Sequence, residues 1–266
     1  KLSIGKYFCS PTSDIVESRL VIRDWLLFMS SDKSHSTHLS IEELLEQFSN
    51  GSSSKRRGLI RVIEDRVDEI SSLGSAALSL FDPEGDDWAA GWILQVQQRH
   101  KPDELRNSFP KDSIAWFKTH SCVGIDYLPF QKALITESFE HADRFTSSTL
   151  RKLAGSAAET RGYVYFSEVK DMPGDDLITL DRLWRAFSQG RFGFSVQARL
   201  LNSLGGRYDR LWPRIGWKEN GVWTRYPNAF NWSIDAKEGH MPLINQLRGV
   251  RLMDALLSHP ALISRR

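Results

Sequence analysis

The chain has 266 residues, of which 41% are hydrophobic, and this is enough apolar material for one large folded unit or two ordinary ones. Its 35 basic and 33 acidic residues nearly cancel, which excludes a protein that holds nucleic acid or a membrane surface through overall charge. The two cysteines, Cys9 and Cys122, form no CxxC pair and have no metal-ligand spacing to a histidine. Neither a zinc site nor a disulfide framework is indicated, and a reducing compartment fits best.

Helical periodicity dominates the first hundred residues. Apolar residues recur at helical intervals over residues 14–29, and Ser40 with Glu43 forms a capping-box pattern in front of a second helix. Residues 59–70 carry a third apolar stripe. Together these patterns predict a small antiparallel helical bundle over residues 1–105, followed by a linker over residues 106–125.

A second unit is expected over residues 126–266, and it is also helical. Its predicted helices are residues 127–134, 139–153, 175–187, 196–204 and one that is opened by Pro242 and ends near His259-Pro260. The short run at residues 162–166, Gly-Tyr-Val-Tyr-Phe, is the most strand-like in the chain. Residues 207–239 have no helical period and predict a long ordered loop with a hairpin at Asn220-Gly221.

The segment of residues 182–232 concentrates basic and aromatic side chains. It holds nine basic residues, two acidic residues and eleven aromatic rings, so its local charge is about +7 although the whole chain is nearly neutral. Some of these rings, such as Trp184 and Phe187, are expected in the core. Five large rings in the predicted loop, however, must cover something.

The last helix offers a second cluster of polar groups. Asn245, Arg248 and Arg251 step by three residues, which predicts an amide and two guanidiniums along one helical stripe. Guanidiniums pair bidentately with carboxylates, so this stripe is suited either to a ligand's acid groups or to salt bridges within the chain.

Catalytic motifs are absent from the sequence. GxSxG, HExxH, Walker and GxGxxG patterns do not occur, and the seven histidines share no ligand spacing. The sequence therefore predicts a binding protein with no catalytic residues and no metal ligands.

Several stretches resemble one family. Residues 183–197 (LWRAFSQGRFGFSVQ), 223–230 (WTRYPNAF) and 239–251 (GHMPLINQLRGVR) closely resemble the genomes-uncoupled-four family of porphyrin-binding accessory proteins of magnesium chelatase. Phe139, Ala142, Asp143 and Thr146 are similar to the family's Trp-x-x-Ala-Asp-x-x-Thr pattern, with Phe139 in place of the Trp. The chain stops six residues after Pro260, without the C-terminal extension of plant members, so a cyanobacterial or algal type is expected.

This resemblance implies an all-α core shaped like a cupped hand that binds protoporphyrin IX or magnesium protoporphyrin IX without a protein-ligated metal. It implies a non-enzymatic activator of magnesium chelatase in chlorophyll synthesis, with the large chelatase subunit as its partner. We further expect a monomer in a cyanobacterial cytoplasm or algal plastid stroma, with peripheral contact to thylakoid or envelope membranes and no nucleic-acid partner.

The expected ligand contacts come from three places: the corner around Gly190, the aromatic loop and the last helix. They are Phe192, Phe194, Gln197, Trp217, Trp223, Arg225, Tyr226, Phe230, Asn245, Arg248 and Arg251. Two alternatives use the same basic and aromatic patch, namely a single-strand nucleic-acid binder and a protein-interaction module without a ligand.

Overall fold

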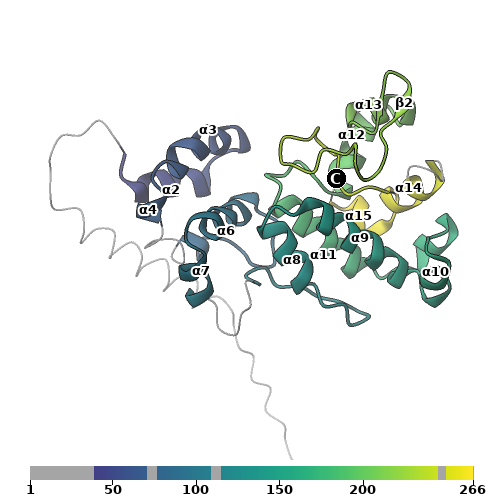
Figure 1. The fold of residues 1–266 in the computed structure, drawn as a ribbon, viewed down its shortest axis with the longest axis horizontal. Coiled ribbons are helices and arrows are strands. Elements are labelled where there is room, and N and C mark those ends of the chain that lie inside the picture. The colour runs from purple at the N-terminus through teal and green to yellow at the C-terminus, as the bar shows by residue number, and fades with distance from the viewer. Residues whose placement is uncertain (1–38, 71–76, 109–114, 245–249, 266) are drawn as a thin grey trace, which may run out of the picture. The chain divides into compact units, whose positions relative to one another are not determined.

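The computed structural model describes residues 39–70, 77–108, 115–244 and 250–265, and the chain divides into two compact units, Lys1–Leu80 and Phe81–Arg266 (Figure 1). Among the described residues the strands amount to one short two-stranded hairpin, so the all-α prediction is confirmed. The helix expected over residues 14–29 lies outside the described residues. Within the described ranges, no helix has both the length and the apolar composition that crossing a bilayer requires.

The described part of the first unit contains three helices, α2 (Ile41–Asn50), α3 (Ser53–Glu64) and α4 (Val67–Ile70). The predicted capping box is confirmed, because Ser40 Oγ accepts from the Glu43 amide at 3.2 Å and Glu43 accepts from the Ser40 amide at 2.9 Å. The apolar stripe of α2 is buried where α2 packs against α3.

The second unit is built around α11 (Gly174–Ala186), which packs against helices from both ends of the unit (Figure 1). These neighbours are α6 (Trp88–His100), α8 (Leu128–Ile135), α12 (Phe194–Ser203) and α15 (Pro260–Ile263). The remaining elements are α7 (Pro102–Ser108), α9 (Phe139–Leu153), α10 (Ser156–Arg161), the 3-10 helix η2 (Phe166–Asp171), α13 (Tyr208–Arg214), β1 (Lys218–Glu219), β2 (Val222–Trp223) and α14 (Val250–Leu257).

Trp184 on α11 forms the centre of the aromatic core. Its ring is fully buried against Phe130, Phe139 and Phe192, with ring centroids 5.9 to 6.3 Å away. Its Nε1 donates to the hydroxyl of Thr146 on α9 at 3.0 Å. The indole N–H is thereby satisfied without water, as a buried tryptophan requires.

Helix α6 packs into this second unit. It crosses α11 so closely that a Cβ on Gly91 would lie 2.1 Å from the carbonyl oxygen of Ala186. The Gln95 side chain donates to the carbonyls of Leu134 and Phe187 at 3.0 and 2.8 Å. The division between the units therefore lies earlier in the chain than the linker expected at residues 106–125.

The second unit differs from the sequence patterns in several places. Residues 208–214 form α13 although Pro213 lies inside that helix, because the chain is already turning helically and the proline occupies its last turn. Residues 162–166, the most strand-like run in the sequence, do not form a strand and instead lead into η2. Residues 242–244 are not helical, so the helix expected to open at Pro242 is wrong there, and α14 is described only from Val250.

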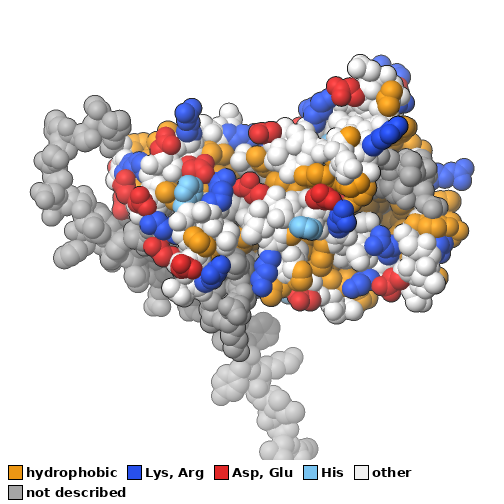
Figure 2. Space-filling model, in the orientation of Figure 1, with side chains coloured by type: hydrophobic (Ala, Val, Ile, Leu, Met, Phe, Trp, Pro, Cys, Tyr) orange, Lys and Arg blue, Asp and Glu red, His pale blue; other side chains and the backbone are white. Residues whose placement is uncertain are grey.

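The predicted hairpin is present. Lys218 pairs with Trp223 and Glu219 with Val222, and Asn220 and Gly221 both have positive φ, at 47° and 83°. Two consecutive residues of this kind make the turn that joins twisted antiparallel strands tightly. On the face shown in Figure 2, charges of both signs alternate with small hydrophobic patches, in line with the nearly neutral composition.

Candidate functional site

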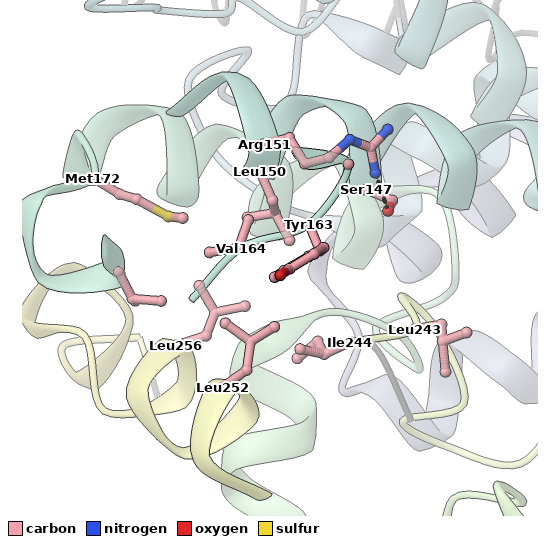
Figure 3. Close-up of a pocket in the computed structure, with 12 residues that line it drawn as sticks. Ser147, Leu150, Arg151, Tyr163, Val164, Met172, Leu243, Ile244, Leu252 and Leu256 are labelled. Atoms are coloured by element: carbon pink, nitrogen blue, oxygen red, sulfur yellow. Dashed lines mark hydrogen bonds between the residues drawn. The ribbon is translucent and has the colours of Figure 1, made fainter. Parts of the chain in front are cut away.

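A small pocket lies between α9, the segment before η2, η2 itself, the chain at residues 243–244 and α14 (Figure 3). Its volume is about 60 Å³. Its walls are mainly apolar and come from Leu150, Val164, Val169, Met172, Leu243, Ile244, Leu252 and Leu256. Helical periodicity explains how α9 and α14 supply such walls, because both helices present one apolar stripe inward.

The polar groups of the pocket are Ser147, Arg151 and Tyr163. Arg151 and Ser147 are one turn apart on α9, and the guanidinium donates to the serine hydroxyl at 3.0 Å (Figure 3). Among the residues that the structure describes, those that line the pocket include an arginine and no carboxylate. An apolar body with an acidic end therefore matches these walls better than a neutral or cationic ligand.

Arg251 is the one member of the predicted Asn245, Arg248 and Arg251 stripe that the structure describes. It is exposed on α14, next to the pocket-lining Leu252, and its guanidinium lies 5.5 Å from the centroid of the Phe166 ring on η2. Asn245 and Arg248 lie outside the described residues. The stripe itself therefore stays a prediction.

Four of the predicted contacts are interior residues in this structure. Phe192, Phe194, Gln197 and Trp217 are each fully buried and none of them lines the pocket. Gln197 Nε2 donates to the carbonyls of Gly239 and Pro242 at 2.9 and 2.8 Å, so this side chain anchors the base of the loop.

The remaining predicted contacts belong to what we call the aromatic loop, residues 215–244. Tyr226 and Trp223 are exposed, at 41% and 38%, and Arg225 is exposed as well. Phe230 is buried, with its ring centroid 5.8 Å from that of Tyr226 and 4.8 Å from that of His240. The structure thus places Tyr226 and Phe230 together, whereas Trp223 packs at the hairpin against Trp212.

Asp143 on α9 joins the aromatic loop to the helix that lines the pocket. Its side chain is 2% exposed, and one carboxylate oxygen accepts from the Leu243 amide at 2.6 Å. Burial raises the pKa of Asp143 to about 7, and the Leu243 amide and the nearby Tyr226 hydroxyl oppose that rise. Burial likewise raises the pKa of Tyr226.

His240, further along the aromatic loop, is a second buried titratable group. Its Nδ1 lies 2.7 Å from the Ile215 carbonyl and therefore carries the proton, and burial lowers the pKa of the ring. In the ranges that the structure covers, no three His, Cys, Asp or Glu side chains gather as a metal site would require.

Sequence reasoning did not identify Arg151 and Tyr163 as polar groups of the pocket. Arg151 is a single charged residue on an amphipathic helix, and nothing local distinguishes it from a solvated arginine. Tyr163 belongs to the strand-like run, and Arg161 stacks on it and on Tyr165, with its guanidinium 4.7 and 4.0 Å from the two ring centroids. The alternation of tyrosines beside an arginine was the available signal.

The fold and the pocket define a class of protein: a helical binding protein whose apolar pocket has an arginine at its edge and a long aromatic loop beside it. A family model described as GUN4-like matches residues 120–260, which is more than half of the chain. The chain belongs to the GUN4-like family.

Similar proteins come from cyanobacteria, algae and plants. A Ycf53-like protein of Synechocystis is 46% identical over 168 residues, which cover 63% of this chain and 71% of that protein. The chloroplastic tetrapyrrole-binding protein of Arabidopsis thaliana is 36% identical over 137 residues, covering 48% of this chain and 52% of the plant protein. The solved structure of GUN4 from Chlamydomonas reinhardtii aligns with a TM-score of 0.53 at 36% identity, over 58% of this chain and 99% of the algal one.

Proposed function

We propose that this protein binds protoporphyrin IX and magnesium protoporphyrin IX and stimulates magnesium chelatase through the large chelatase subunit, without being an enzyme itself. The observation that carries the proposal is the match of the family model across the pocket-bearing residues 120–260, together with the relative that is named a tetrapyrrole-binding protein. Such a protein is expected in a cyanobacterial cytoplasm or an algal plastid, in contact with the membranes where chlorophyll is made.

The chemistry of the pocket suits a tetrapyrrole. A porphyrin has a flat apolar body and two propionates, and the pocket has aliphatic walls with Arg151 at its edge and Arg251 on the neighbouring helix. In this proposal the guanidiniums of Arg151 and Arg251, with Asn245 and Arg248, pair with the propionates. Metal ligation by the chain is not required.

The size of the pocket requires a further step. A volume of about 60 Å³ holds only a few atoms, whereas sites for ligands of drug size have about 300 Å³ or more. Binding therefore requires that a wall be displaced. The aromatic loop supplies the wall residues Leu243 and Ile244, and its exposed Trp223, Arg225 and Tyr226 are then available to cover the macrocycle.

The nucleic-acid alternative predicts exposed rings along a basic groove. Of the rings in residues 182–232, all of which the structure describes, only Trp223 and Tyr226 are exposed. Trp212 and Trp217 are buried and stack on each other at 5.6 Å. This arrangement favours a ligand at the pocket over a stacked single strand.

The test is an absorbance titration with protoporphyrin IX and with its magnesium complex, comparing the wild-type protein with Arg151→Ala, Arg251→Ala and Arg106→Ala. Arg106 is an exposed arginine that pairs with Asp103 on its own helix, α7, and does not line the pocket, so it serves as the matched control. Loss of a charge-assisted contact should weaken binding about tenfold in the first two variants and leave the control unchanged. Absence of a saturable spectral shift in the wild type would overturn the proposal.

The chelatase step is tested separately. Magnesium insertion into protoporphyrin IX is measured with purified chelatase subunits, with and without this protein. Stimulation that is lost in Arg151→Ala connects the pocket to the chelatase, whereas unchanged insertion rates in the presence of the wild type would remove that part of the proposal.

A further inference from the structure

Asp143 is an uncommon group in its surroundings. On α9, the neighbouring Arg144 is held by Glu140 at 2.7 Å, and among the described residues that act on the Asp143 carboxyl its charge has the smallest influence. Glu140 itself opposes ionisation. From the aromatic loop, the carboxyl meets the Tyr226 hydroxyl and the Leu243 amide.

The aromatic loop covers this carboxyl but has its own anchor elsewhere. The Arg191 guanidinium donates to the Ala236 carbonyl at 2.7 Å, and the Gly239 amide donates to the Arg191 carbonyl at 2.8 Å. The Gln197 side chain donates to the carbonyls of Gly239 and Pro242. These contacts fix residues 236–242 at the base of the loop. Asp143 instead contacts Tyr226 in the middle of the loop and Leu243 immediately beyond the base.

We propose that Asp143 is a positioning residue for the pocket, whose carboxyl group fastens Tyr226 and the Leu243 wall to α9 so that the aromatic loop opens when this acid is ionised. The statement about the ligand rests on the proposed tetrapyrrole function, whereas the opening of the loop does not.

The direction of the effect follows from linkage. With the loop closed, burial holds the pKa of Asp143 at about 7, above its ordinary value of 3.8. In this proposal, lifting the loop returns the carboxyl to water, where the ordinary value applies. A proton is therefore bound more tightly in the closed state, and the closed state is favoured at low pH. As the pH rises towards 7, the population of the open state increases. Above pH 7 the free-energy difference between the open and closed states no longer changes with pH.

The hydrogen bond between Asp143 and the Leu243 amide bears on access to the pocket. Leu243 is one of its walls, and the pocket is too small for a large ligand while that wall is in place. A neutral Asp143 keeps the wall closed, and an ionised Asp143 lowers the cost of moving it. Site access should therefore depend on pH in the wild-type protein.

The test without a ligand is hydrogen exchange, which measures the opening of the loop. Exchange of the Leu243 and Tyr226 region is followed by mass spectrometry from pH 5.5 to 8.5, with the intrinsic exchange rate divided out. Opening should increase about 30-fold over this interval in the wild type, as the two pKa values require. Asp143→Asn should show no such increase, because the amide does not titrate.

Two single-hydroxyl variants make a matched pair. Tyr226→Phe removes a donor that lowers the pKa of Asp143, so the rise in exchange should continue to a higher pH than in the wild type. Tyr127→Phe removes the hydroxyl that donates to buried Asp176 at 2.8 Å and should leave the profile unchanged. A residue with a merely structural role would not move this midpoint.

An exchange profile that is the same in the wild type and in Asp143→Asn would overturn the inference. So would a rise in exchange that has its midpoint at the same pH in Tyr226→Phe as in the wild type. If Asp143→Asn does not fold, the comparison of Tyr226→Phe with Tyr127→Phe still decides the question. The rate of protoporphyrin IX association should rise with pH in the wild type and stay constant in Asp143→Asn. A protein that binds no porphyrin but keeps the exchange profile would remove the proposed function and leave the fastening intact.

Discussion

Replacement of Asp143 by asparagine is expected to stabilise the protein, and more so at pH 8 than at pH 5. The carboxyl has a pKa of about 7 when folded and 3.8 as its ordinary value, a difference of roughly three pKa units or about 4 kcal/mol. Because the folded pKa is raised, the unfolded chain loses its proton first, and the unfolding free energy falls as the pH rises from about 4 to 7. Above pH 7 the contribution stays constant.

Between pH 5 and pH 8 the wild type should lose about 3 kcal/mol relative to Asp143→Asn, since part of the loss is already complete at pH 5. His240 and His259, whose pKa values burial lowers, stabilise with rising pH instead, but both variants share them, so they cancel in the difference. The measurement is urea unfolding at both pH values, followed by tryptophan fluorescence, because eight of the nine tryptophans lie in Phe81–Arg266. A stability difference that does not change with pH would refute a buried, raised acid at this position.

Two further substitutions test the core of the second unit. Gly91→Ala would place a Cβ 2.1 Å from the Ala186 carbonyl oxygen, so we expect α6 to be displaced and the unfolding free energy to fall by about 3 kcal/mol. Gly58 lies on a helical surface with open space around it, so Gly58→Ala should stabilise its helix by up to about 1 kcal/mol. Calorimetry that showed equal effects for the two glycines would contradict the close crossing. Thr146→Val keeps the volume but leaves the buried Trp184 N–H without its acceptor, which should destabilise by about 1 to 3 kcal/mol in chemical unfolding; a neutral result would mean that the indole finds another partner.

Local patterns predicted local structure well. Ser40 and Glu43 form the capping box that their spacing indicated, and Asn220-Gly221 forms the hairpin turn. Each of these features depends on residues within a few positions of one another, so the sequence contains all of the information that is needed. The helix over residues 139–153 was predictable for the same reason, because its apolar stripe is regular.

Long-range features were predicted less well. Phe192 and Phe194 are aromatic residues beside a glycine corner, and the pattern that suggested a ligand contact is equally the pattern of a tightly packed core. Arg151 reaches the pocket only because residues 243–244, about ninety positions later, complete its walls. No helical period contains that information, since it depends on which helices meet. The resemblance to a known family supplied the ligand class, but it did not locate the pocket.

The fold itself does not need an acid at position 143. A structural role would be met by asparagine, which can accept from the Leu243 amide, is nearly the same size, and avoids the burial of a charge. Tyr226 could then bond to the amide group of that asparagine. An aspartate in this place instead makes the closed loop less stable as the pH rises, and proteins tolerate such local destabilisation chiefly where an element has to move. In the proposed function Leu243 is displaced to admit a ligand larger than a few atoms, so the destabilised contact is located where that motion is needed. If Asp143→Asn proves more stable and yet admits protoporphyrin IX as fast as the wild type at pH 8, this connection between instability and access is wrong.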